Sequence, residues 1–240
     1  MTFDIHAALP TALADRAGAW EFIRAFAADR SRAIGDADGY DAAELDASAA
    51  RLGVELPAAL RELYRLLGRR EDLTSNHDVL LPPDKLYVED DVLVFREENQ
   101  GVAWWGVRLG GEDPAVVVSY SPATPTAEHW TAWLPKLSLA AVEMVLSETV
   151  LFDDKLMEAQ DLDPEDLDEL PEEMAELAFP GYPESEPPGE RVRWFAGPNL
   201  LGRYDGGMML IRARTEEHLE LFFDAVCGPD EDEDEAAEEA

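Results

Sequence analysis

Three short apolar runs separated by turn residues constrain the fold more than any other feature of this 240-residue sequence. The runs cover residues 92–95, 102–107 and 115–118, and they are rich in the β-branched and aromatic residues typical of strands. The connections at 98–101 and 110–114 contain Gly, Asn, Asp and Pro. Connections this short join antiparallel neighbours, because a parallel crossover needs a dozen or more residues. The region therefore predicts a three-stranded antiparallel meander.

Helical periodicity surrounds the meander. Apolar residues recur at helical spacing over 11–30, 41–52, 57–68 and 130–150, the last interrupted at Pro135, and residues 86–88 add a possible strand. Residues 191–195 are strand-like, and 200–204 and 208–212 flank the hairpin signal Asp205-Gly206-Gly207. Thr215 can cap a last helix. The order predicts an α+β fold, with an antiparallel sheet (the meander plus a C-terminal hairpin) flanked by helices.

Acidic residues are concentrated in two places. The tail 229–240 contains eight acids, and we expect it to be disordered. Residues 153–190 contain 15 acids and one lysine, and their leucines are spaced for short amphipathic helices. We predict one domain over 1–228, with 153–190 as an acidic helical and loop insertion.

The net charge excludes several partners. Removing the eight tail acids from the formal charge of −34 leaves −26 on the body. Nucleic acids and anionic membranes need a basic surface, so we expect neither as a partner. The sequence has no apolar run long enough for a transmembrane helix and no signal-peptide pattern at its start, so we expect a cytoplasmic location. Solubility and salt adaptation also explain such a charge.

The chain lacks the common catalytic motifs. A lone cysteine, Cys227, excludes an intramolecular disulfide framework and Cys-rich metal sites. The four histidines, at 6, 77, 129 and 218, form no metal-binding motif, and no nucleophile elbow or phosphate-binding loop is present. The spacing Asp161-x-Asp163-x-Glu165 is similar to a calcium loop but lacks its glycine and its terminal glutamate. We therefore expect a protein that is not an enzyme, with no cofactor and no metal.

Several motifs resemble one protein family. The helix start at 52–57, followed by Leu60-x-x-Leu63-Tyr64, resembles the opening of SUKH superfamily domains. The turn Glu98-Asn99-Gln100-Gly101, with Trp105-Gly106 on the next strand, resembles the strand–turn–strand signature of the same superfamily. Residues 113–116 fit its following strand, and 130–134 are similar to its helix after the meander. The resemblance covers about residues 50–150, and the long acidic stretch departs from it.

The resemblance implies a binding protein. The superfamily is typified by fungal regulators of cell-wall synthesis and by bacterial immunity proteins that neutralise toxins, often nucleases. It therefore implies an α+β protein that binds a cognate toxin stoichiometrically. A regulatory or scaffold domain unrelated to toxins is the alternative, and a metal-dependent or carboxylate enzyme is a second one.

Two groups of residues are candidates for partner binding. Adjacent tryptophans on a strand point to opposite faces, so one of the pair at 104 and 105 enters the core. The other is either an exposed anchor for a partner or covered by a helix. The acidic segment supplies the second group, because a nuclease must carry a basic cleft. The candidates are Glu97, Glu98, Gln100, Trp104, Trp105, Asp161, Asp163, Glu165 and Asp166.

Overall fold

The computed structural model describes residues 3–120, 130–152, 154–183 and 191–227. No helix within these ranges is long and apolar enough to cross a membrane. The acidic tail and His129 lie outside the described residues. The helices are α1 (Ile5–Ala14), α2 (Arg16–Arg30), α3 (Ala42–Leu52), α4 (Ala58–Leu67), α5 (Glu71–Thr74), α6 (Leu137–Val150) and α7 (Glu216–Cys227), with short 3₁₀ turns η1 (Asp36–Asp38) and η3 (Asp166–Glu169).

The N-terminal helices follow the predicted periodicity with one break. The helix expected over 11–30 is two helices, α1 and α2, because Asp15 adopts an extended conformation between them. Its side chain accepts a hydrogen bond from the backbone N–H of Gly18, which satisfies a free donor at the start of α2. Asp41 caps α3 in the same way through the N–H of Glu44. The predicted helix at 57–68 is α4, which Gly68 ends.

The predicted meander is the centre of sheet A. Among the described residues this sheet has six strands: β1 (Val79–Leu80), β2 (Tyr87–Glu89), β3 (Val92–Glu97), β4 (Trp104–Arg108), β5 (Val116–Ser119) and β6 (Thr131–Leu134). The order is β1-β3-β4-β5-β6, with β2 also paired to β3, and every pair is antiparallel. The meander prediction is thus confirmed, and the expected strand at 86–88 is β2.

The helix predicted over 130–134 is wrong, because these residues form strand β6. Val117 pairs with Ala132 and Val118 with Thr131 across β5 and β6. The apolar residues Trp130, Trp133 and Leu134 fit a helical turn by spacing alone, and all three are buried. The free edge of β5 provides backbone partners that local periodicity does not reveal. The helix begins only after Pro135, as α6.

The C-terminal half forms a second sheet, sheet B. Its strands are β7 (Met157–Asp161), β8 (Ala175–Glu176), β9 (Arg193–Ala196), β10 (Leu200–Tyr204) and β11 (Met208–Ala213), in the antiparallel order β7-β11-β10-β9-β8. The predicted hairpin is β10–β11, and α7 follows Thr215 as expected. The prediction of amphipathic helices in 153–190 is wrong for the residues of β7 and β8, which form the two edge strands of this sheet.

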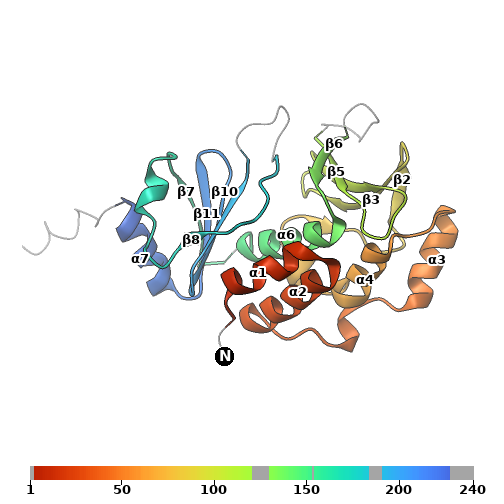
Figure 1. The fold of residues 1–240 in the computed structure, drawn as a ribbon, viewed down its shortest axis with the longest axis horizontal. Helices are drawn as coiled ribbons and strands as arrows, with labels where there is room; N and C mark the ends of the chain where they lie inside the picture. The colour runs from red at the N-terminus through yellow and green to blue at the C-terminus, as the bar shows by residue number, and fades with distance from the viewer. Residues whose placement is uncertain (1–2, 121–129, 153, 184–190, 228–240) are drawn as a thin grey trace, which may run out of the picture.

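Helix α6 lies at the centre of the molecule, between the two sheets and above α1 and α2 (Figure 1). Every residue of α6 except Thr149 is buried, because the N-terminal helices, β6, β10 and β11 all pack on it. The main core is continuous from Ile5 in α1 through α6 to Leu201 in sheet B. A smaller core joins sheet B to α7 and η3. The chain thus forms an α+β fold with antiparallel sheets flanked by helices.

Candidate functional site

The residues predicted to bind a partner fall into two separate groups. Glu97, Glu98, Gln100, Trp104 and Trp105 lie on β3, β4 and the turn between them in sheet A. The acidic candidates from 161 to 166 lie at the end of β7 and the start of η3, in sheet B. Figure 1 places β3 and β7 on opposite sides of α6. The structure therefore does not bring the two groups together in one site.

Both tryptophans of the first group are buried. Trp104 is 7% exposed and Trp105 is 5% exposed. The Trp105 ring packs edge-on against Trp133, with 5.9 Å between ring centroids, and the Arg96 guanidinium lies 4.7 Å from the Trp105 centroid. Of the two alternatives drawn from the sequence, both indoles pack inside and neither is an exposed anchor.

The second group belongs to a larger acidic face. We use this name for the exposed carboxylates of 161–173 together with those of α7. Leucines of η3 and the apolar side of α7 pack into the same small core, so the two segments lie side by side (Figure 1). Residues 156–190 and α7 contain no lysine or arginine. The exposed acids of the face are Asp161, Asp163, Glu165, Asp168, Glu169, Glu172, Glu173, Glu216, Glu217, Glu220 and Asp224.

A cavity of about 280 Å³ lies between sheet A, α6 and sheet B. Its apolar walls include Trp105 and Trp133. Its polar lining includes His77, Asp78 and Arg96. It thus combines aromatic walls with a few converging polar groups, the usual composition of a small-ligand or ion site.

Arg96 on β3 forms a buried ionic cluster on one side of this cavity. Its Nη1 lies 3.2 Å from Glu143 Oε2, and its Nη2 lies 2.7 Å from Glu148 Oε1 and 3.0 Å from Asp78 Oδ2. All four side chains are at least nine-tenths buried. Buried charges persist only when they are paired and hydrogen-bonded, and one guanidinium here faces three carboxylates.

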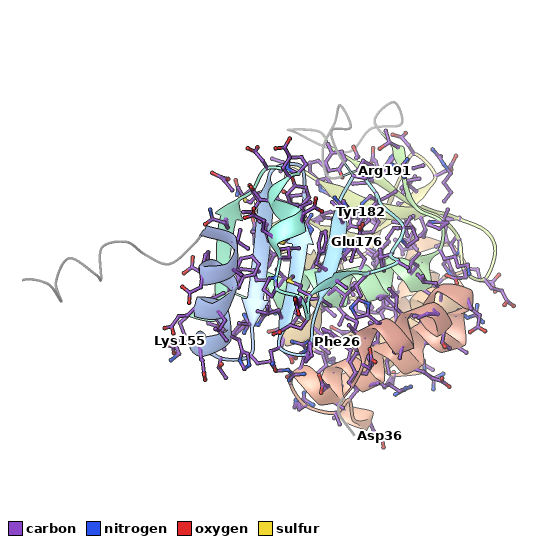
Figure 2. The ribbon with its side chains drawn as sticks, turned by 60° about the vertical axis from the view of Figure 1, so that its left-hand side comes forward. Phe26, Asp36, Lys155, Glu176, Tyr182 and Arg191 are labelled. Atoms are coloured by element: carbon purple, nitrogen blue, oxygen red, sulfur yellow. The ribbon has the colours of Figure 1, made fainter. Side chains whose placement is uncertain are left out.

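Hydrogen bonds extend the cluster to sheet B. The Tyr182 hydroxyl and the Ser147 hydroxyl each donate to Glu143 Oε1 at 2.6 Å. Trp194 Nε1 in turn donates to the Tyr182 hydroxyl oxygen at 3.2 Å. Tyr182 therefore links α6 to β9, and Figure 2 shows it between the two sheets. The network ties the three layers around the cavity together.

Burial and charge shift the pKa values of the cluster in different directions. Burial raises the pKa of Asp78 to about 6, although Arg96 acts to lower it. Burial by itself lowers the pKa of Arg96, but the attraction of Asp78, Glu148 and Glu143 outweighs it, so the pKa of Arg96 is raised. Arg96 therefore stays charged, and burial favours the protonated form of Asp78.

Sequence reasoning missed this cluster, although part of it left a signal. Glu143 and Glu148 are charged residues within a run that is otherwise apolar, and Arg96 ends an apolar strand. A charge at a core position of a periodic pattern indicates a buried ion pair. His77 and Asp78 gave no such signal, because they lie in a short connection between α5 and β1.

Comparisons of the chain with protein-family models, with curated proteins and with solved structures found no significant match. The resemblance to SUKH domains therefore stays a prediction that rests on the motifs in residues 50–150.

Proposed function

We propose that this chain is a non-catalytic binding protein that neutralises a basic toxin domain by stoichiometric association. The observation that carries the proposal is the acidic face, in which η3 and α7 present carboxylates from segments without lysine or arginine, and in which Glu216 pairs with Lys155. A toxin that acts on nucleic acid needs a positively charged cleft to hold phosphates. A surface of opposite charge can cover that cleft and exclude the substrate without any chemistry.

The packing behind the face favours a binding role. Leu167 and Leu170 on the η3 side, with Phe222 and Phe223 on α7, pack under the carboxylates. The carboxylates therefore lie on segments whose backbone is held in place by the apolar core beneath them. Such preorganisation lowers the entropy lost on association. Long-range attraction between the face and a basic partner also raises the association rate, by about 10- to 1000-fold at low ionic strength.

The first experiment measures association kinetics with a partner captured by the tagged chain from lysate of its own cells. A charge-reversal variant replaces Asp161, Asp163, Glu165 and Glu169 with lysine. It spares Asp166, whose carboxylate accepts the backbone N–H of Asp163 at 2.7 Å and holds the turn. We expect the association rate at low salt to fall by at least about tenfold, with little change in the dissociation rate.

A matched control separates the face from the overall charge. Reversing Glu21, Glu55, Asp84 and Glu89 alters the net charge equally at exposed positions on α2, on β2 and in the connections before α4 and before β2. At the same salt concentration we expect this control to slow association several-fold less than the acidic-face variant does, because the attraction between charges weakens with distance and is screened. Equal slowing in both variants would contradict a role for the acidic face.

Neutralisation is tested separately from binding. Expression of the captured partner alone should inhibit cell growth, and co-expression of this chain should restore it. A captured partner without toxicity would instead favour the regulatory or scaffold alternative. In that case the acidic face would still be the docking surface, but the toxin assignment would fail.

A further inference from the structure

We propose that His77, Asp78 and Glu98 form a binding site for a divalent transition-metal ion at one end of the cavity. Each of the three residues offers one ligand atom, and these atoms all lie within 4.8 Å of one another. One imidazole nitrogen and two carboxylate oxygens are ligands that Zn²⁺ and related ions accept. The inference concerns a different part of the molecule from the acidic face and does not depend on the proposed function.

Strand register brings the three residues together. Val79 pairs with Glu97 and Leu80 with Arg96 across β1 and β3. Continuing this antiparallel register by one residue places Asp78 opposite Glu98. His77 then comes opposite Asn99, whose side-chain nitrogen lies 3.2 Å from the His77 ring nitrogens.

The backbone around the site is fixed by hydrogen bonds. The N–H groups of His77 and Asp78 donate to the two carboxylate oxygens of Glu148, at 2.7 and 3.3 Å. On the other strand, Glu98 Oε2 accepts the N–H groups of Gln100 and Val102, at 2.7 and 3.2 Å. A tetrahedral zinc site needs ligand atoms about 3.4 Å apart. Rotation of the half-buried His77 side chain can close the remaining distance, while the Glu98 carboxylate keeps its backbone donors.

Asp78 provides an independent sign that a ligand belongs here. Its side chain is about nine-tenths buried, and Oδ2 pairs with Arg96. Its other oxygen, Oδ1, has no hydrogen-bond partner among the described residues. A buried carboxylate oxygen without a partner destabilises the fold, because its lost hydration is not replaced. A metal ion bound to Oδ1 would remove this cost.

The local charge also favours a cation. Asp78, Glu98, Glu143 and Glu148 supply four carboxylates at this end of the cavity, against the one guanidinium of Arg96. The other arginine of the lining, Arg203, comes from sheet B and lies 3.4 Å from the carboxylate of Asp205. A divalent ion would offset most of the excess negative charge.

The cavity leaves room for the ion's remaining ligands. Trp105 Nε1, Trp133 Nε1 and Arg96 Nε are buried donors without a hydrogen-bond acceptor in the part of the chain that the structure describes. All three belong to residues of the cavity lining. Three protein ligands leave at least one open position on the metal. An oxygen ligand at that position would accept hydrogen bonds from these N–H groups.

Isothermal titration of the full chain with ZnCl₂, after treatment with a chelator, tests the site. The buffer contains about 1 mM MgCl₂ to occupy weak sites on the acidic surface. We expect one equivalent of Zn²⁺ to bind with a dissociation constant of micromolar order or tighter. His77→Ala and Glu98→Gln should each weaken binding by at least about tenfold.

Matched controls and a stability readout complete the test. His218→Ala removes a histidine on α7, and Asp163→Asn removes an acid of the acidic face, so both should bind Zn²⁺ as the wild type does. Zn²⁺ should raise the melting temperature of the wild type and of both controls, but not that of His77→Ala. The proposal is overturned if binding is only millimolar, if His77→Ala binds as tightly as the wild type, or if Mg²⁺ alone binds as tightly as Zn²⁺.

Discussion

Arg96 and its three carboxylates show how single residues organise the interior. A buried guanidinium is tolerated because Glu143, Glu148 and Asp78 lie within 3.2 Å of its nitrogens. Replacing such a cluster by apolar residues can be neutral for stability, whereas removing one partner leaves an uncompensated buried charge. We therefore expect the cluster to contribute more to the positions of β3, α6 and the segment before β1 than to net stability.

Asp38 is another buried carboxylate, and it gives a prediction for acid stability. Hydrogen bonds from Arg32 at 2.7 and 2.8 Å, together with the N–H of Gly35, lower the pKa of Asp38 to about 2. A carboxyl whose pKa is lowered by folding stabilises the protein above its unfolded pKa of about 4, and this contribution is lost as the pH falls towards 2. We expect Asp38→Asn to lower the free energy of unfolding by about 1 kcal/mol at pH 7, after allowance for solvent around Arg32.

Urea unfolding of the wild type and Asp38→Asn between pH 7 and pH 2.5 measures this difference. The gap between the two proteins should shrink as the pH falls through the range from about 4 to 2. Asp36→Asn, at an exposed position of the same 3₁₀ turn, is the control and should have little effect. A gap that is equally large at both ends of the pH range would refute the assignment.

At the scale of elements, strands β3 and β4 approach closely at Gly106. A Cβ built on Gly106 would lie 2.3 Å from Val92 Cγ1 and 3.0 Å from the carbonyl oxygen of Leu93. Val92 is β-branched and fully buried, so its methyl group has little freedom to move aside. The glycine at this position thus permits the pairing of Val94 with Gly106 that sets the register of the meander.

Gly106→Ala should therefore destabilise the protein by about 1–3 kcal/mol through overpacking. Chemical denaturation measures the change, and Gly35→Ala is the control, because its Cβ would contact only the Asp38 carboxylate, at 4.0 Å. Adding Val92→Ala to Gly106→Ala should restore part of the lost stability if the clash is the cause. Purely additive effects of the two substitutions would show that another contact is responsible.

At the scale of the whole molecule, the continuous core predicts that the two sheets unfold together. Val107 in sheet A and Leu201 in sheet B are both fully buried in the main core, which passes through α6. Truncating either to alanine should cost about 1–4 kcal/mol. If 1–228 is one cooperative domain, each substitution lowers the protection of slow-exchanging amides in both sheets by the same free energy.

Hydrogen exchange followed by mass spectrometry on peptides from β4 and β10 tests this coupling. Leu221→Ala, at an exposed apolar position of α7, should change neither sheet. A loss of protection confined to sheet B in Leu201→Ala would divide the chain into two units joined at α6.

The sequence alone determined the features that depend on local chemistry. The meander, the hairpin at Asp205–Gly207, helix α3 and helix α7 with its cap Thr215 were predicted, because apolar periodicity, turn residues and capping side chains act over a few positions. The acidic candidates 161–166 were also expected at the surface, and they are exposed or half-buried. These features need no knowledge of distant contacts.

Tertiary structure decided the features that depend on distant partners. Residues 130–134 and 157–161 became strands because β5 and β11 offered unpaired backbone groups, which a periodicity of apolar residues does not encode. The burial of both Trp104 and Trp105 required elements on both faces of sheet A. The grouping of His77, Asp78 and Glu98 required the register of β1 with β3, which only the folded chain supplies, because strand pairing joins residues that are far apart in sequence.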